Sequence, residues 1–197
     1  MMEAITARPT SRRIPAGRFF LFWAIALAGA GFDLGTKSYF FNWIGEPHAR
    51  ERPVTVIRDV LELQTSYNPG ALWGFMRSVP YSPQIFAALS IVAAAGICVW
   101  LFVLGAAVDR RLTVALALIM AGALGNCYDR LVLGKVRDFV HLHVDAIRFD
   151  CAIFNFADNM LVVGAVALVL LALRPEAHPE AETAPIEPTA AARAGPP

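Results

Sequence analysis

The sequence predicts a membrane protein of the all-α class, a bundle of four transmembrane helices with a small extracytoplasmic β-rich cap. Of its 197 residues, 57% are hydrophobic and 17% are charged, and the mean hydropathy is +0.53. A soluble domain of this size would expose too much apolar surface with such a composition. Four long apolar runs predict the helices, and two segments that alternate apolar and polar residues predict the cap.

The four apolar runs predict the four helices. They extend from Phe19 to about Phe40, from about Ile85 to Leu104, from Leu112 to Leu131, and from Ile153 to Leu173. Each has roughly 20 residues, the length an α-helix needs to cross about 30 Å of hydrocarbon. The first run ends in polar residues rather than at a small-x-small cleavage site, which favours a retained helix over a cleaved signal peptide.

The segments that follow the first and third helices predict the cap. Residues 41–84 contain VTVIRDVLELQTSYNPG, and residues 132–152 contain KVRDFVHLHV. Both partly alternate apolar and polar residues, as strands do, and the first ends in a Pro-Gly turn. Because consecutive helices cross in opposite directions, both segments lie on the same side of the membrane.

Four spans place both termini on one side, which we assign to the cytoplasm. Arginines before the first helix and the pair Arg110-Arg111 favour this side, although it holds only eight of the 17 Lys and Arg residues. We expect three parts: a cytoplasmic segment 1–18, a membrane domain 19–173 with outer loops at about 41–84 and 132–152, and a disordered cytoplasmic tail 174–197 rich in Pro, Ala and Glu. The net charge of +1 indicates no nucleic-acid partner.

Polar residues inside the spans are few and gather near the outer face. Ionisable groups in a membrane span are costly and are therefore candidates for function. The residues concerned lie at the outer ends of the first, third and fourth helices: Asp33, Lys37, Asn126, Asp129, Arg130, Asn155 and Asp158.

Their spacing predicts local pairs. Asn126 precedes Asp129 by three residues and Asn155 precedes Asp158 by three, so each Asn is expected beside its own Asp on one helix face. Asp33 and the Lys four residues after it are expected to form an ion pair.

Two carboxylates at one depth suit aspartyl-protease chemistry. The pair holds one proton, because two adjacent negative charges are costly. Asp129 lies near a helix C-terminus and Asp158 near a helix N-terminus, so helix polarity suggests that the proton resides on Asp129 and that Asp158 is the base. The residues alone leave open a proton-coupled transporter or channel subunit. The absence of HExxH and GxSxG disfavours zinc and serine peptidases.

Four motifs resemble those of the lipoprotein signal peptidases (signal peptidase II), a family of membrane aspartyl proteases. They are DLGTK (33–37), NPGALWGF (68–75), GALGNCYDRLVLGKVRDFV (122–140) and FNFADN (154–159), in the family's order. The resemblance covers roughly residues 19–173.

The resemblance implies a hydrolase of the bacterial inner membrane that removes signal peptides from diacylglyceryl-modified prolipoproteins, cleaving before the lipidated Cys near the extracytoplasmic face. It implies membrane phospholipid and a globomycin-type inhibitor as further partners, and no cofactor. The catalytic residues it implies are Asp129 and Asp158. The residues it implies for substrate binding or site support are Asp33, Lys37, Asn68, Gly70, Asn126, Arg130, Asp138 and Asn155.

For one of these residues, and for one turn, the sequence predicts specific contacts. Arg130 directly follows a catalytic Asp, so it should point away from the pair, toward lipid phosphate, a loop carbonyl or Asp138. The turn Asn68-Pro69-Gly70 should help to hold the substrate in extended form.

The sequence departs from the family pattern between Asp138 and Asn155, where DFVHLHVDAIRFDCAIFN lacks the usual FP proline and carries His141. The shape of residues 139–153 is therefore not predicted. His141 and His143 share a face if they lie on a strand, but no third ligand is evident, so we predict no metal.

Overall fold

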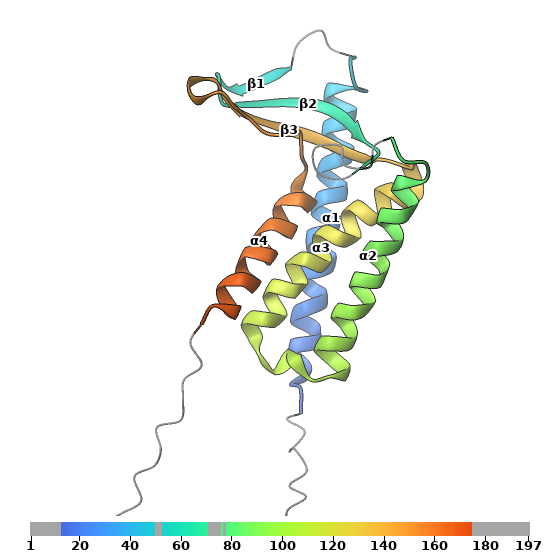
Figure 1. Ribbon diagram of the computed structural model, residues 1–197, viewed down its shortest axis with the longest axis vertical. Coiled ribbons are helices and arrows are strands. Elements are labelled where there is room, and N and C mark those ends of the chain that lie inside the picture. The colour runs from blue at the N-terminus through green and yellow to red at the C-terminus, as the bar shows by residue number, and fades with distance from the viewer. Residues whose placement is uncertain (1–12, 50–52, 71–75, 77, 175–197) are drawn as a thin grey trace, which may run out of the picture.

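The computed structural model describes residues 13–49, 53–70, 76 and 78–174. Four helices lie side by side, and a small antiparallel sheet covers one end of the bundle (Figure 1). The helices are α1 (Ala16–Ile44), α2 (Ser82–Cys98), α3 (Arg110–Leu133) and α4 (Phe156–Ala172). A π-helical turn η2 (Val99–Val103) extends α2, and a 3-10 turn η3 (Ala106–Val108) leads into α3.

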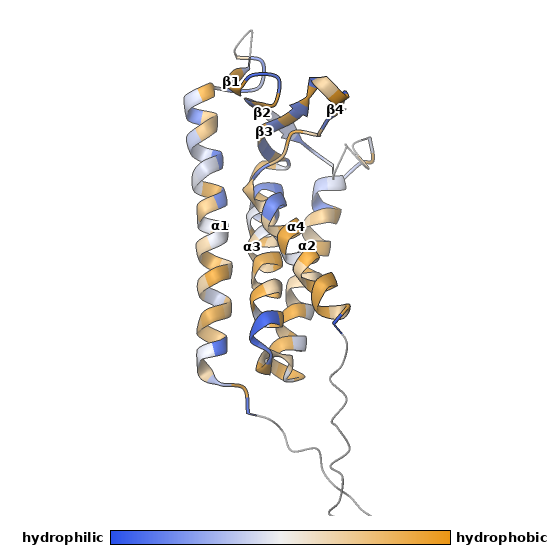
Figure 2. Ribbon diagram, turned by 90° about the vertical axis from the view of Figure 1, so that its left-hand side faces the viewer, coloured by the Kyte–Doolittle hydropathy of each residue, from blue (hydrophilic) through white to orange (hydrophobic). Residues whose placement is uncertain are grey.

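All four helices correspond to the four apolar runs, and their residues are largely apolar (Figure 2). The first three, with α2 counted through η2, have 29, 22 and 24 residues, enough to cross a membrane by length and composition. Helix α4 has 17 residues, the short end of the range of about 17–25 that can span hydrocarbon. It begins at Phe156 rather than at the predicted Ile153, because Asn155 caps it.

The sheet joins the two alternating segments that the sequence singles out. Its strands are β1 (Val54–Ile57), β2 (Leu61–Asn68), β3 (Val136–Val144) and β4 (Phe149–Asp150), in the antiparallel order β1-β2-β3-β4. The atypical segment 139–153 forms the second half of β3, the 3-10 turn η4 (Asp145–Ile147) and β4. The register of β2 on β3 shifts between Leu63 and Ser66.

Helix α3 is the centre of the bundle, because it contacts α1, α2 and α4. Its packing on α4 is close: a Cβ atom at Gly122 would overlap the carbonyl oxygen of Ala157, and one at Gly164 would lie 2.8 Å from that of Ala115. Small residues therefore set the distance between the two helices that carry the candidate catalytic aspartates.

The described chain enters α1 and leaves α4 at the same end of the bundle, opposite the sheet (Figure 1). This agrees with an even number of spans. The predicted disordered tail lies outside the described residues, apart from Arg174, as does most of the N-terminal segment.

Candidate active site

A buried polar cluster lies where α1, α3 and α4 meet the sheet. Asp33, Lys37, Asp129 and Asn155 are fully buried, and Asp138 is 2% exposed. Buried charges are costly unless they are paired or hydrogen-bonded, so the contacts of these groups define the site.

Lys37 links α1 to α3. Its Nζ lies 2.7 Å from Asp33 Oδ2, donates to Asn126 Oδ1 at 2.8 Å, and lies 3.4 Å from Asp129 Oδ2. The predicted ion pair within α1 is confirmed. The same ammonium group also faces a candidate catalytic carboxylate, which local spacing in α1 does not reveal.

Asp33 links α1 to α4. Its Oδ1 accepts a hydrogen bond from the backbone N–H of Ala157 at 2.8 Å, in the first turn of α4. Gly125 on α3 leaves room for this carboxylate, because a Cβ atom there would overlap Asp33 Oδ2. Asp33 on α1 thus contacts both α3 and α4.

Asp129 is held by Arg137, a residue that sequence reasoning missed. The Arg137 backbone N–H donates to Asp129 Oδ2 at 3.0 Å, Nη2 donates to Oδ1 at 2.8 Å, and Nε donates to Oδ1 at 3.2 Å. The chain reverses between α3 and β3 at Gly134, whose φ of 68° suits glycine. In the sequence, the signal that could have revealed this contact is the glycine turn at Gly134 followed by the cation Arg137.

These contacts also bear on the proton of the pair. Helix polarity favours a proton on Asp129, but the structure places the cations of Arg137 and Lys37 against that carboxylate. The assignment of the proton to Asp129 stays a prediction.

Asp158 is held in a capping box at the start of α4. Asn155 Oδ1 accepts from the Asp158 backbone N–H at 3.0 Å, and Asp158 Oδ2 accepts from the Asn155 backbone N–H at 3.2 Å. The pairing of Asn155 with its own Asp is confirmed. Asn126 behaves differently: its Nδ2 donates across the helices to Asp158 Oδ1 at 2.8 Å. The side chain of Asn126 thus connects Asp158 to Lys37, which faces Asp129.

A third carboxyl group, that of Asp138 on β3, lies in the same cluster. Asn155 Nδ2 donates to its Oδ1 at 2.6 Å. Burial, together with the charge of Asp158, raises the pKa of Asp138 to about 7.

Arg130 lines the same cavity as Asp158 and Asp138, and its strongest contacts are with a loop and an aromatic ring. Its Nη2 donates to the carbonyl oxygen of Gly70 at 3.2 Å, and its guanidinium lies 5.3 Å from the centre of the Phe86 ring. Of the expected partners, it thus takes a loop carbonyl. The Gly70 N–H donates to Asn68 Oδ1 at 3.0 Å, which closes the predicted turn.

A cavity of about 280 Å³ opens beside Asp158. Its polar wall includes Asn68, Asn126, Arg130 and Asp138, and its apolar wall includes Phe154, Leu161 and Val162. Asp129 is fully buried and does not line this cavity. Of the two aspartates, only Asp158 therefore faces the open space.

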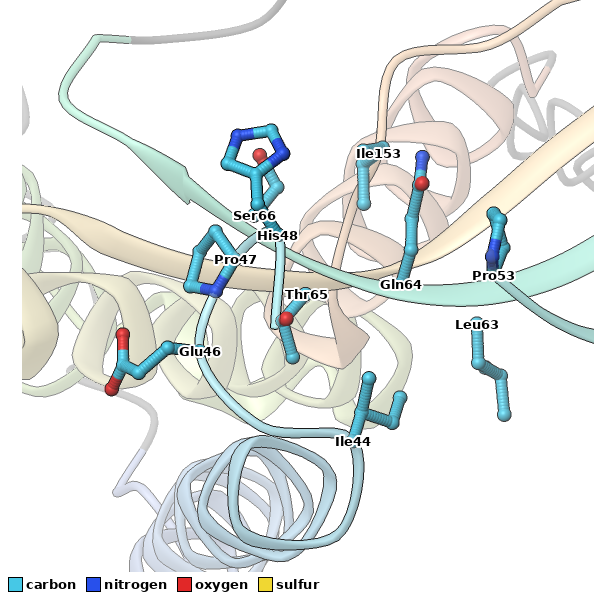
Figure 3. Close-up of a pocket in the computed structure, with 10 residues that line it drawn as sticks. All are labelled: Ile44, Glu46, Pro47, His48, Pro53, Leu63, Gln64, Thr65, Ser66 and Ile153. Atoms are coloured by element: carbon cyan, nitrogen blue, oxygen red, sulfur yellow. The ribbon is translucent and has the colours of Figure 1, made fainter. Parts of the chain in front are cut away.

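A second cavity, of about 250 Å³, lies between the end of α1 and strand β2 (Figure 3). Ile44, Glu46, His48 and Thr65 are among its lining residues, and neither candidate catalytic aspartate lines it. Thr65 donates a hydrogen bond to the Gly45 carbonyl oxygen at 2.8 Å.

A bundle of apolar helices with two carboxylates linked through a buried amide and a buried lysine, one of them facing a cavity, has the features of a membrane-embedded aspartic peptidase. Residues 25–174 match the model of the family Signal peptidase (SPase) II. The chain belongs to this family.

Relatives and solved structures agree. The chain is 34% identical over 210 residues to the lipoprotein signal peptidase of Rhodopirellula baltica, covering 95% of this chain and 92% of that protein. It is 37% identical over 155 residues to the one from Pseudomonas putida, covering 78% and 86%. Two solved structures of a bacterial membrane enzyme superpose with TM-scores of 0.67 and 0.66 at 28% identity; they cover 78% and 79% of this chain, and 88% and 94% of theirs.

The protein is therefore a hydrolase, an aspartic peptidase of the bacterial inner membrane that acts on prolipoproteins.

Proposed function

We propose that Asp129 and Asp158 are the catalytic pair of this peptidase and that they cleave diacylglyceryl-modified prolipoproteins directly before the lipidated Cys. The observation that carries this proposal is the bond from Asn126 Nδ2 to Asp158, at 2.8 Å, because Asn126 also binds the lysine that faces Asp129. Two carboxylates from different helices thus share one buried network.

The reaction needs only these carboxyl groups and a water molecule. The ionised member of the pair takes a proton from water as the water oxygen bonds to the scissile carbonyl carbon, while the protonated member donates a hydrogen bond to the carbonyl oxygen. The tetrahedral intermediate then collapses: its C–N bond breaks, and the departing cysteine nitrogen receives a proton from the pair. No covalent enzyme intermediate forms.

The remaining cluster residues position the pair. Lys37 and Asn126 fix the relative placement of α1, α3 and α4, and Asn155 fixes the first turn of α4. Asp33 neutralises Lys37. Asp138 holds the Asn155 amide.

The cavity beside Asp158 is the proposed substrate site. Its apolar wall on α4, Leu161 and Val162, suits an acyl chain or an apolar signal-peptide residue, and its polar wall suits a peptide backbone. The turn from Asn68 to Gly70 would hold the peptide extended by strand-like hydrogen bonds. Membrane phospholipid and a globomycin-type inhibitor would compete for the same space.

We place the sheet at the extracytoplasmic face and both termini in the cytoplasm. The helix ends opposite the sheet carry Arg18, Arg110, Arg111 and Arg174, and arginines flanking short loops favour the cytoplasm. In this arrangement residues 19–173 are the working membrane domain, flanked by cytoplasmic segments 1–18 and 174–197.

The test is a gel-shift cleavage assay on a diacylglyceryl-modified precursor peptide. Asp129→Asn and Asp158→Asn should each lower kcat by more than about 1000-fold, because each removes one role of a cooperating pair. Asp59→Asn, which changes an exposed turn residue, is the matched control and should cleave normally. A globomycin-type cyclic peptide should block the unmodified enzyme.

Intact precursor in the presence of well-folded unmodified protein would overturn the proposal. Proton-coupled flux in liposomes that disappears with the same two substitutions would point to a transporter instead.

A further inference from the structure

Three potential metal ligands meet on the sheet, away from the aspartate cluster. Glu62 on β2 lies directly opposite His141 on β3, and His143 follows two residues later on the same face. Glu62 Oε2 lies 3.9 Å from His141 Nδ1 and 3.8 Å from His143 Nε2. The two imidazole rings are stacked, with centroids 5.1 Å apart. The third ligand that the sequence did not reveal is thus supplied by strand register.

Hydrogen bonds on the far side of each ring determine which nitrogen is available. His141 Nε2 lies 2.7 Å from Asp150 Oδ1, and His143 Nδ1 lies 2.9 Å from Asp145 Oδ1. An ionised carboxylate only accepts, so each of these ring nitrogens carries the proton. In the neutral rings, the lone pairs are then left on His141 Nδ1 and His143 Nε2, the two nitrogens that face Glu62.

Those two nitrogens are buried and have no hydrogen-bond partner among the described residues. Two lone pairs that face a carboxylate repel it, and a cation bound between the three groups would remove this repulsion. Carboxylates that orient metal-binding histidines from behind are a regular feature of protein metal sites. Here both histidines have one.

We propose that Glu62, His141 and His143 bind a divalent transition-metal ion of the Zn²⁺ class. Two imidazole nitrogens and one carboxylate oxygen form a common set of three protein ligands for zinc, with the fourth position open to water. Bonds of about 2.1 Å at tetrahedral angles separate ligand atoms by about 3.4 Å. The three ligand atoms here lie within 4.8 Å of one another, so small side-chain rotations complete the site.

The bound ion would fasten β2 to β3 on one side of the register shift. Glu62 and His141 pair before the irregularity at Leu63–Ser66, and Asp138 pairs after it, opposite Ser66. Three residues of a strand span about 10 Å, so the ion lies about that far along β3 from the aspartate cluster. Its role is to fix the strand that carries Arg137 and Asp138, not to take part in the hydrolysis.

A proton is the competing occupant. The hydrogen bond that His143 donates to Asp145 raises the pKa of His143, and the charges of Glu62 and Asp150 add to the effect. Protonated His143 has no lone pair to offer, so metal affinity should fall as the pH is lowered through that pKa.

Equilibrium binding to tag-free full-length protein in detergent tests the proposal. After chelator treatment, the protein should bind one Zn²⁺ in competition with a fluorescent chelator, and Co²⁺ should give the visible absorption of a tetrahedral site. Glu62→Gln and His143→Ala should each weaken Zn²⁺ binding by more than about 100-fold. Asp145→Asn should weaken it by about 10- to 100-fold, because it removes only the orienting carboxylate.

The matched controls are His48→Ala and His178→Ala, which remove the other two histidines of the chain and should bind Zn²⁺ normally. Binding that survives Glu62→Gln and Asp145→Asn, or that is lost with either control, would overturn the site, as would failure to bind one equivalent at micromolar Zn²⁺. No substrate is used, so the result is independent of the proposed catalytic pair. If a ligand variant fails to fold, Asp145→Asn still decides.

Discussion

At the scale of single residues, the contact between Arg137 and Asp129 says most about how the catalytic pair is positioned. Its guanidinium and its backbone N–H together bind both oxygens of Asp129. This carboxylate is therefore oriented before substrate arrives, while Asp158 faces the cavity. We infer that Arg137 is a positioning residue for the catalytic pair.

Replacing Arg137 should slow catalysis more than it weakens substrate binding. Arg137→Met removes charge-assisted hydrogen bonds worth about 1.5–3 kcal/mol each, so kcat should fall about 10- to 100-fold with KM little changed. Arg137→Lys keeps the charge but not the two-point geometry, and its kcat should lie in between. Steady-state kinetics across a pH series measure both effects, since the pH–rate profile of the Met variant should also move.

Arg148→Met is the control for this experiment, because it removes an exposed arginine of the same sheet region. An Arg137→Met enzyme with the kcat and the pH–rate profile of the unmodified protein would show that Arg137 only fills space.

What the sequence predicts at this scale follows from distance along the chain. The Asp33–Lys37 pair and the cap of Asp158 by Asn155 were predictable, because helix geometry alone brings residues three or four apart together. The bond of Asn126 to Asp158 depends on how α3 packs against α4, and Glu62 opposite His141 depends on strand register. Neither can be deduced from spacing.

At the scale of elements, the approach of α3 to α4 decides whether the two aspartates meet. Gly122 and Gly164 allow the helices to touch at backbone level. The apolar runs predicted that the helices exist, and the alternation of apolar and polar residues predicted that the strands exist. The start of α4 was not predictable, since it is set by the capping geometry of Asn155.

Gly122→Ala should disrupt this contact. The added methyl group would overlap the Ala157 carbonyl, which is backbone and cannot rotate away. Overpacking of this kind costs about 1–3 kcal/mol, so the apparent Tm in detergent and the cleavage rate should both fall. Gly31→Ala is the matched control: a methyl group there meets nothing within 4 Å, and removing a helical glycine should leave stability unchanged or slightly higher. Equal Tm values for the two variants would contradict the role assigned to Gly122.

At the scale of the whole molecule, the sheet and the arginine-bearing helix ends lie at opposite ends of the bundle (Figure 1). The proposed orientation therefore makes a prediction for labelling in intact spheroplasts. In a background with Cys98, Cys127 and Cys151 replaced by alanine, a cysteine placed at exposed Arg148 should react with a membrane-impermeant maleimide.

A cysteine placed at exposed Arg111 should react only after permeabilisation, because that end faces the cytoplasm in our proposal. Labelling in the opposite pattern would reverse the orientation and place the sheet on the cytoplasmic side.

The ion pair within α1 has a consequence for how the protein enters the membrane. A charged residue inside a spanning helix is costly to insert into the membrane. Asp33 and Lys37 lie 2.7 Å apart on one helix, so α1 leaves the translocon with its own counter-ion and no net charge from this pair. Helix α3 is different, because Asp129 meets Lys37, synthesised before it, and Arg137, synthesised after it. Helix α1, which carries Lys37, is therefore synthesised before α3 and can pair with it.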